Sequence, residues 1–227
     1  MTRRVRIAVI DSGVHASHPH VGGVAGGIGI DDAGARHHDF VDRLGHGTAV
    51  AAVIREKAPA SEMHAIKVFD RELAATGRAL AAACDYALEH KVDLVNLSLG
   101  TRNTGHQSLL AEAVDRLLAA GATIIAAGEQ EGVRWLPGSL PGVWSVTLDW
   151  ALPRDRCALD RLSASGAAFR ASGYPRPIPG VPPERNLSGL SFAVANVTGI
   201  VAELLADADA GTAAVVVARA FQSGRLA

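Results

Sequence analysis

Short apolar runs alternate with longer helical stretches along most of this chain, and this alternation most constrains its fold. The apolar runs predict strands at residues 5–10, 63–69, 92–97, 122–127 and 143–148. The stretches between and after them predict helices at residues 46–57, 74–90, 109–120, 192–205 and 212–221. Strands that alternate with helices favour a parallel sheet covered on both faces. We therefore expect an α/β fold of three layers, with a mostly parallel central sheet flanked by helices.

Two segments interrupt this pattern. Residues 22–34 are rich in glycine, which predicts a loop or a hairpin. Residues 175–183 hold five prolines, which predicts an ordered loop or an extended segment rather than a helix. Neither segment has the composition of a linker, so we expect a single domain over residues 1–227.

Charge and composition limit the partners that this chain can have. The formal net charge is −1 and 48% of the residues are hydrophobic, which gives no sign of a nucleic-acid or membrane partner. We expect no apolar stretch long enough to span a bilayer and no signal peptide. The two cysteines, Cys84 and Cys157, suit reduced thiols in the cytoplasm, with a single disulfide in a secreted protein as the minority alternative.

Three polar residues beside apolar runs are candidates for catalysis. Asp11 ends the first run, His46 begins the first predicted helix, and Ser191 precedes a long apolar helix. A serine hydroxyl needs a base within hydrogen-bond reach, and a carboxylate fixes the tautomer of a histidine that serves as that base. Each residue alone could be a turn, a helix start or a helix cap. Together, in this order, they predict a nucleophilic triad.

The motifs around these residues resemble those of the subtilisin family of serine peptidases, from about Ile7 to about Leu205. The resemblance rests on Asp11-Ser12-Gly13, His18-Pro19, His46-Gly47-Thr48, residues 65–68, residues 95–100 and Gly189-Leu190-Ser191-Phe192-Ala193. It implies a three-layer subtilisin-like fold and a serine endopeptidase that needs no cofactor. It also implies that Asp11, His46 and Ser191 are the catalytic residues.

The segment that would stabilise the oxyanion departs from the family pattern. Relatives have an asparagine after an Ala-Ala-Gly strand end, whereas this chain has Glu129 and Gln130 after Gly128. One alignment register places Glu129 at that position and the other places Gln130 there. We favour Gln130 as the catalytic donor, because its amide can donate to an oxyanion and an ionised Glu129 would repel it. Backbone N–H groups alone are the remaining alternative.

The resemblance also implies which residues bind the substrate: Ser98, Leu99, Gly100, Ala127, Gly128, Glu129 and Leu190. Leu190 and Phe192 replace the usual threonine and methionine beside the nucleophile. We expect no metal site, because His20 replaces an acidic residue that binds calcium in many relatives, and histidine is a poor ligand for that cation. The histidines at 15, 18, 20, 37 and 38 match no standard zinc spacing.

The chain reaches Asp11 almost at once, so we expect an intracellular enzyme that folds without a pro-segment. An intracellular peptidase with a narrow substrate is similar to leader peptidases of bacterial peptide-maturation systems. One such peptidase trims the small subunit of quinohemoprotein amine dehydrogenase. A leader or precursor peptide is therefore the expected substrate, with modifying enzymes of the same pathway as possible partners. The alternatives are a catalytically silent domain that binds a peptide and, more weakly, a metal-dependent hydrolase.

Overall fold

The computed structural model describes residues 4–208 and 211–226 and contains one large, mostly parallel sheet. Within these residues, nine strands lie in the order β10-β11-β9-β6-β5-β1-β4-β2-β3. The central strands are β1 (Arg6–Asp11), β4 (Glu62–Lys67), β5 (Leu94–Leu97), β6 (Thr123–Ala127) and β9 (Trp144–Leu148). Each of these pairs in parallel with its neighbours. All five correspond to predicted strands, and the expected parallel sheet is confirmed.

The two edges of the sheet are antiparallel. At one edge β2 (Gly26–Ile30) pairs with β3 (Arg36–His37), so the glycine-rich segment begins a hairpin. At the other edge β10 (Cys157–Ser163) and β11 (Gly166–Ala171) form a hairpin that the sequence did not predict. A separate small hairpin, β7 (Glu129–Gln130) with β8 (Val133–Arg134), follows β6.

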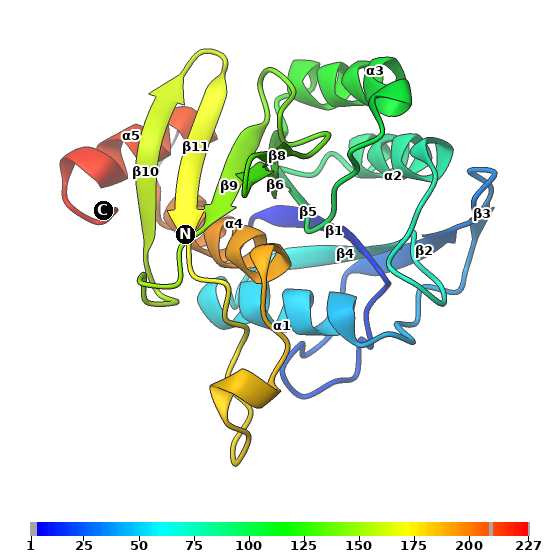
Figure 1. Cartoon of the computed structure of the whole chain (residues 1–227), viewed down its shortest axis with the longest axis horizontal. Coiled ribbons are helices and arrows are strands. Elements are labelled where there is room, and N and C mark those ends of the chain that lie inside the picture. The colour runs from blue at the N-terminus through cyan, green and yellow to red at the C-terminus, as the bar shows by residue number, and fades with distance from the viewer. Residues whose placement is uncertain (1–3, 209–210, 227) are drawn as a thin grey trace.

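Helices cover both faces of the sheet (Figure 1). One face packs against α1 (His46–Lys57), α4 (Leu190–Asp207) and α5 (Ala213–Gln222). The other packs against α2 (Gly77–Glu89) and α3 (Gln107–Ala119). Strand β1 serves both cores, because Ile7 and Val9 point to the first and Ala8 and Ile10 to the second. The three-layer α/β arrangement is therefore confirmed. Two short 3₁₀ turns, η1 (Thr104–His106) and η2 (Pro183–Arg185), complete the described elements.

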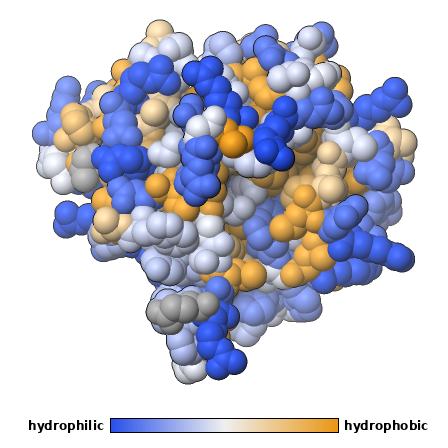
Figure 2. Space-filling view, in the orientation of Figure 1, coloured by the Kyte–Doolittle hydropathy of each residue, from blue (hydrophilic) through white to orange (hydrophobic). Residues whose placement is uncertain are grey.

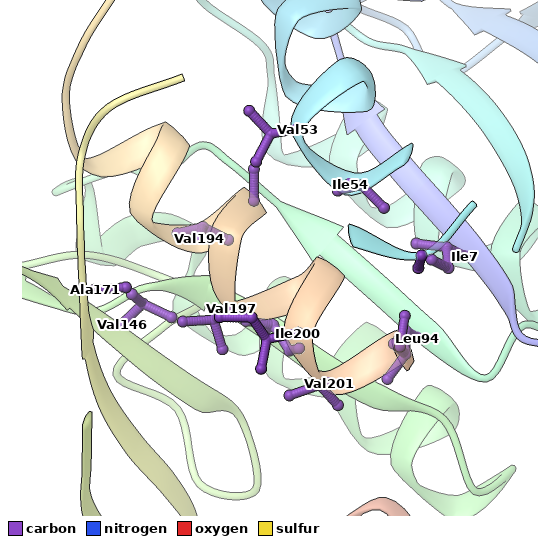
Figure 3. Close-up of a cluster of buried hydrophobic side chains, with 14 of the residues drawn as sticks. Ile7, Val53, Ile54, Leu94, Val146, Ala171, Val194, Val197, Ile200 and Val201 are labelled. Atoms are coloured by element: carbon purple, nitrogen blue, oxygen red, sulfur yellow. The ribbon is translucent and has the colours of Figure 1, made fainter. Parts of the chain in front are cut away.

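Helix α4 runs through the middle of the first core. Figure 3 shows Val194, Val197, Ile200 and Val201 of α4 packed among side chains from the sheet and from α1. By length and composition α4 could cross a membrane, so the expectation that no stretch was long enough is wrong. However, 72% of this apolar window is buried inside the protein. A helix enclosed by a sheet and two other helices must be apolar nearly all round, which accounts for its hydropathy.

Candidate active site

Asp11 and His46 meet where the last residue of β1 faces the first residue of α1. The two side chains share a hydrogen bond of 2.7 Å between His46 Nδ1 and Asp11 Oδ1. Asp11 is fully buried, and the His46 side chain is 13% exposed. The carboxylate also accepts the backbone N–H of Ser12 at 2.7 Å. Asp11 thus fixes one ring nitrogen of His46 and leaves Nε2 available to a reacting group.

Two glycines allow α1 to approach the end of β1 this closely. A Cβ atom at Gly47 would lie 2.2 Å from the carbonyl oxygen of Gly13, which is a severe steric clash. Gly13 has φ of 94°, in the region that glycine adopts without strain. The Gly residues in the two motifs therefore have a packing reason: they bring the histidine helix against the aspartate strand.

Asp42 holds the start of α1 in place, although the sequence analysis did not single it out. Its Oδ2 accepts the backbone N–H of Thr48 at 2.9 Å and the Thr48 hydroxyl at 2.6 Å. Its Oδ1 accepts the Ser12 hydroxyl and the N–H groups of Leu44 and Gly45, each at 2.9 Å. Ser12 Oγ in turn accepts the N–H of Gly47 at 2.9 Å. This network joins β1, the preceding loop and the helix that carries His46.

The electrostatic surroundings favour the imidazolium form of His46. Burial acts to lower the pKa of His46, but the hydrogen bond and charge of Asp11, together with the charge of Asp42, outweigh it and raise the pKa. The pKa of Asp42 is held below its ordinary value, because its hydrogen bonds from Thr48, Ser12 and Leu44 outweigh its burial. Both carboxylates are thus suited to stabilise a positive charge on His46.

Ser191 lies in the first turn of α4, after Gly189, whose φ of 140° is a conformation that side chains rarely adopt. Its hydroxyl donates to the carbonyl oxygen of Ser98 at 3.0 Å, so its single hydrogen is not directed to His46 in this rotamer. The Ser98 hydroxyl donates back to the carbonyl oxygen of Ser191 at 2.8 Å. The hydroxyl hydrogen must therefore turn away from the Ser98 carbonyl before it can be donated to the imidazole.

A buried polar chain connects this pair to the middle of the fold. Asn96 on β5 donates to the Ser98 hydroxyl at 2.9 Å, and Thr198 on α4 donates to the Asn96 amide oxygen at 2.9 Å. Asn96 and Thr198 are fully buried. Because buried polar groups are costly unless paired, this chain fixes the register of α4 against β5 and hence the position of Ser191.

Backbone donors at the start of α4 can receive an oxyanion. The N–H groups in the first turn of a helix have no acceptor within the helix, and the helix dipole favours negative charge there. Leu190 and Ser191 contribute two of these groups, and the first turn contains no acidic residue.

His46 and Ser191 open onto one cleft of about 470 Å³. Five of the predicted substrate-binding residues line it: Ser98, Leu99, Gly100, Ala127 and Leu190. The sequence motifs gave no sign of the remaining lining residues, which are Phe69, Leu73, Ala74, Ala75, Leu80, Thr101 and Trp135. These residues come from the loop before α2, from α2 itself and from the turns beside Gly100, so only the fold brings them together.

The other predicted residues lie outside this lining. Gly128 and Glu129 line a different hollow, where Glu129 Oε2 lies 3.5 Å from Arg134 Nε. The amide oxygen of Gln130 accepts the backbone N–H of Leu148 at 3.3 Å. The β7–β8 hairpin thus directs both candidate donors toward neighbouring strands. Their catalytic role stays a prediction.

The histidines of the sequence analysis are spread over separate places. His15, His18 and His20 border a hollow on the other side of the α1 start, and His37 borders a third hollow near Asp39. Within residues 4–208 and 211–226, no group of three or more His, Cys, Asp or Glu side chains is arranged to hold a metal ion. Cys84 and Cys157 are free and buried.

Comparison with known proteins identifies the class of this protein. Residues 2–148 match the Subtilase family of peptidases, and the chain belongs to this family. The matched segment contains Asp11 and His46 and ends before Ser191, which the fold places in the same cleft as His46.

Two curated proteins illustrate the sequence similarity. The chain is 29% identical over 182 residues to the minor extracellular protease Epr of Bacillus subtilis (strain 168), covering 75% of this chain and 27% of that protein. It is 33% identical over 153 residues to the thermostable alkaline protease of Halalkalibacterium halodurans, covering 62% of this chain and 40% of that protein. The chain thus spans less than half the length of these relatives.

Solved structures share the fold over most of the chain. A cold-adapted subtilisin-like serine proteinase matches with a TM-score of 0.70 and 21% identity, covering 94% of this chain and 80% of that one. A lanthipeptide protease matches with a TM-score of 0.68 and 18% identity, covering 93% and 77%. The prenylagaramide maturation protease PagA matches with a TM-score of 0.64 and 24% identity, covering 88% and 74%. The expected subtilisin-like fold is therefore confirmed.

Proposed function

We propose that this chain is a serine endopeptidase in which Ser191 is the nucleophile, His46 the general base and Asp11 the residue that orients His46. The observation that carries the proposal is the 2.7 Å bond between Asp11 and His46, with His46 and Ser191 on the wall of the same cleft. Such a triad is recognised by its geometry and by the roles of its members.

The reaction begins when the Ser191 hydroxyl leaves the Ser98 carbonyl and turns to His46. His46 Nε2 takes the hydroxyl proton as Ser191 Oγ attacks the scissile carbonyl carbon. The imidazolium, stabilised by Asp11, gives the proton to the leaving amine, and the C–N bond breaks. A water molecule then attacks the acyl-enzyme with His46 again as the base, and Ser191 is restored.

The developing oxyanion needs donors, and the backbone N–H of Ser191 is suited to supply one. Gln130 remains our proposed side-chain donor, and its present contact with Leu148 would have to break first. Losing one side-chain donor of this kind costs about 10²–10³ in kcat. A backbone-only oxyanion hole therefore predicts a slow enzyme, not an inactive one.

We further propose that the substrate is a leader or precursor peptide that the enzyme cuts during maturation in the cytoplasm. Support comes from structural neighbours that are described as a prenylagaramide maturation protease and a lanthipeptide protease. The precursor of the quinohemoprotein amine dehydrogenase small subunit is one substrate to test. Enzymes that modify the same precursor are the proposed partners.

The test is cleavage of a proteome-derived peptide library and of that small-subunit precursor, followed by mass spectrometry. We expect the parent to cut at a narrow set of sites and Ser191→Ala to cut none. Ser165→Ala is the matched control, because Ser165 is an exposed serine in the turn between β10 and β11. Equal cleavage by the parent and Ser191→Ala would show that Ser191 is not the nucleophile.

One observation favours a second function, a catalytically silent domain that binds peptides. Ser191 is engaged with Ser98, and neither candidate side-chain donor lines the cleft. A silent domain would bind peptides from the same library without cutting them, and it would not react with a fluorophosphonate.

A further inference from the structure

A second hollow of about 580 Å³ lies beside the catalytic residues, and no step of the proposed mechanism uses it. Its floor is formed by Gly45, which precedes α1, and by Thr48, Ala49 and Ala52 on one face of α1. Its walls are the histidine loop, residues 15–20, and the proline-rich segment, residues 175–187. Figure 1 shows these two segments descending beside each other below α1. We call this hollow the flanking pocket.

The flanking pocket and the cleft border the same two segments, which carry His46 and Ser191. Gly45 borders the pocket and immediately precedes His46, which borders the cleft. Leu187 borders the pocket a few residues before Leu190 and Ser191, which border the cleft. Because the two hollows meet at these segments, we infer that an extended peptide that crosses Ser191 with one flank in the cleft reaches this pocket with the other.

The pocket carries positive charge. This charge comes from Arg176 and Arg185, which line the pocket beside His15, His18 and His20. Burial and the nearby charge of Arg176 lower the pKa of His20, which favours its neutral form. Arg176 Nε lies 4.0 Å from a carboxylate oxygen of Glu56, a long contact that leaves most of its donors free. Arg185 is exposed and has no ion-pair partner among the described side chains. Figure 2 shows hydrophilic side chains over the projecting end of this segment.

Among the described lining residues Asp42 is the one carboxylate, and its charge is already engaged within the protein. Asp42 is 9% exposed, and its two oxygens already accept hydrogen bonds from Ser12, Leu44, Gly45 and Thr48. Its negative charge is directed into the start of α1 and toward His46. The free donors at the mouth of the pocket are the arginines and the imidazoles.

Apolar surface lies between these donors. Ile178 is 45% exposed and Leu187 is 48% exposed, although both are large hydrophobic residues, and Ala49 and Ala52 form the floor. An occupant that covers Ile178 and Leu187 buries this apolar surface away from water, which favours binding. The ligand that fits is an acidic side chain next to an apolar one in an extended peptide.

We propose that the flanking pocket binds an acidic residue of the substrate, on the opposite side of the scissile bond from the residues that enter the cleft. Arg185 and Arg176 pair with its carboxylate, and Leu187 and Ile178 cover an adjacent apolar side chain. This inference rests on the proposed peptidase function for the direction of the peptide. The pocket therefore selects which precursors can be cut.

Binding is measured by fluorescence anisotropy on the Ser191→Ala variant, because that readout does not depend on turnover. The probes are two labelled octapeptides, Ala-Ala-Leu-Glu-Glu-Leu-Ala-Ala and the same peptide with two lysines in place of the glutamates. We expect the glutamate peptide to bind at least about tenfold more tightly at low salt, which corresponds to ~1.4 kcal/mol. The advantage falls with added salt, since the pocket mouth is open to solvent.

A second substitution tests whether the preference for the glutamate peptide arises in this pocket. Arg185→Glu, introduced in the Ser191→Ala background, should reduce the glutamate-to-lysine ratio at least about fivefold, the scale of one lost charge pair. Arg219→Glu is the matched control, because Arg219 is an exposed arginine on α5 without an ion-pair partner among the described residues. The proposal is overturned if the two peptides bind equally, if neither binds, or if both arginine changes have the same effect. Reaction of the parent with a fluorophosphonate tests the peptidase function separately.

Discussion

Asp42→Asn tests whether the network at the start of α1 positions His46. The change keeps the size of the side chain but removes its charge and turns one acceptor oxygen into a donor. If the amide nitrogen takes the place of Oδ2, it faces the backbone N–H of Thr48, and two donors cannot form a hydrogen bond with each other. If it takes the place of Oδ1, it faces the N–H groups of Leu44 and Gly45. In either orientation at least two hydrogen bonds to a carboxylate are lost.

The size of the effect follows from these bonds. A hydrogen bond to a charged group contributes about 1.5–3 kcal/mol, and neighbouring bonds are not additive, so we expect the free energy of unfolding to fall by about 3 kcal/mol. Because the pKa of Asp42 is lowered, its carboxylate stabilises the folded state above its ordinary pKa. That contribution is lost as the pH falls through the lowered pKa. The difference between parent and variant should therefore shrink in acid.

Catalysis should change in a way that a purely structural defect does not produce. Asp42 helps to raise the pKa of His46, so its neutralisation should move the rising limb of the kcat/KM profile to lower pH. Displacement of His46 should reduce kcat/KM by about tenfold to a hundredfold, the cost of a misplaced catalytic group. The assays are urea unfolding and peptide cleavage between pH 5 and about 9.

Asp39→Asn is the control, since Asp39 lies in the same loop and its carboxylate faces Arg43 at the surface. It should leave the stability and the pH profile unchanged within error. The reasoning is refuted if Asp42→Asn has the same free energy of unfolding as the parent. It is also refuted if the rising limb of its kcat/KM profile lies at the same pH as in the parent.

Three further substitutions test separate parts of the account. Gln130→Ala should lower kcat by about 10²–10³ with unchanged KM, because its amide is the proposed oxyanion donor; a change of less than about threefold would leave the oxyanion to backbone N–H groups. Gly47→Ala should lower the free energy of unfolding by about 2 kcal/mol or more, because the new methyl group meets the Gly13 carbonyl; an unchanged melting temperature would contradict this. Burial lowers the pKa of Lys57 from 10.5 to about 8, so the unfolded chain binds more protons in that interval and the stability of the parent should rise with pH there. Lys57→Met should abolish that rise, as measured by urea unfolding across the interval.

The sequence predicted the central sheet and its helices because their signals are local. Residues 46–57 were predicted as a helix and form α1 with those bounds. The hairpin of β10 and β11 was missed, because its first strand has no strict alternation: Cys157 and Ala158 are both buried, and Asp160 and Arg161 are both exposed. Its position is determined by pairing with β9, which no local pattern reveals.

In the site too, residues with local sequence signals could be predicted, whereas residues whose roles depend on tertiary contacts could not. Asp11, His46 and Ser191 could be singled out because each ends or begins an element and has a reactive side chain. Asp42 could not, since its role depends on contacts with Ser12 and with the start of α1. An acidic residue four positions before His46 is a weak signal by itself. The directions of the Glu129 and Gln130 side chains depend on the short β7–β8 hairpin, which the sequence did not predict.

The most direct test of the central claim is the rate at which a fluorophosphonate inactivates the protein, with the adduct located by mass spectrometry. We expect one adduct, on Ser191, and a rate that rises with pH as His46 loses its proton, above the ordinary histidine pKa of about 6.5. Asp11→Asn should slow the reaction by about four orders of magnitude, the effect of this change in serine peptidase triads. No adduct on Ser191, or the same rate in Asp11→Asn as in the parent, would contradict the account.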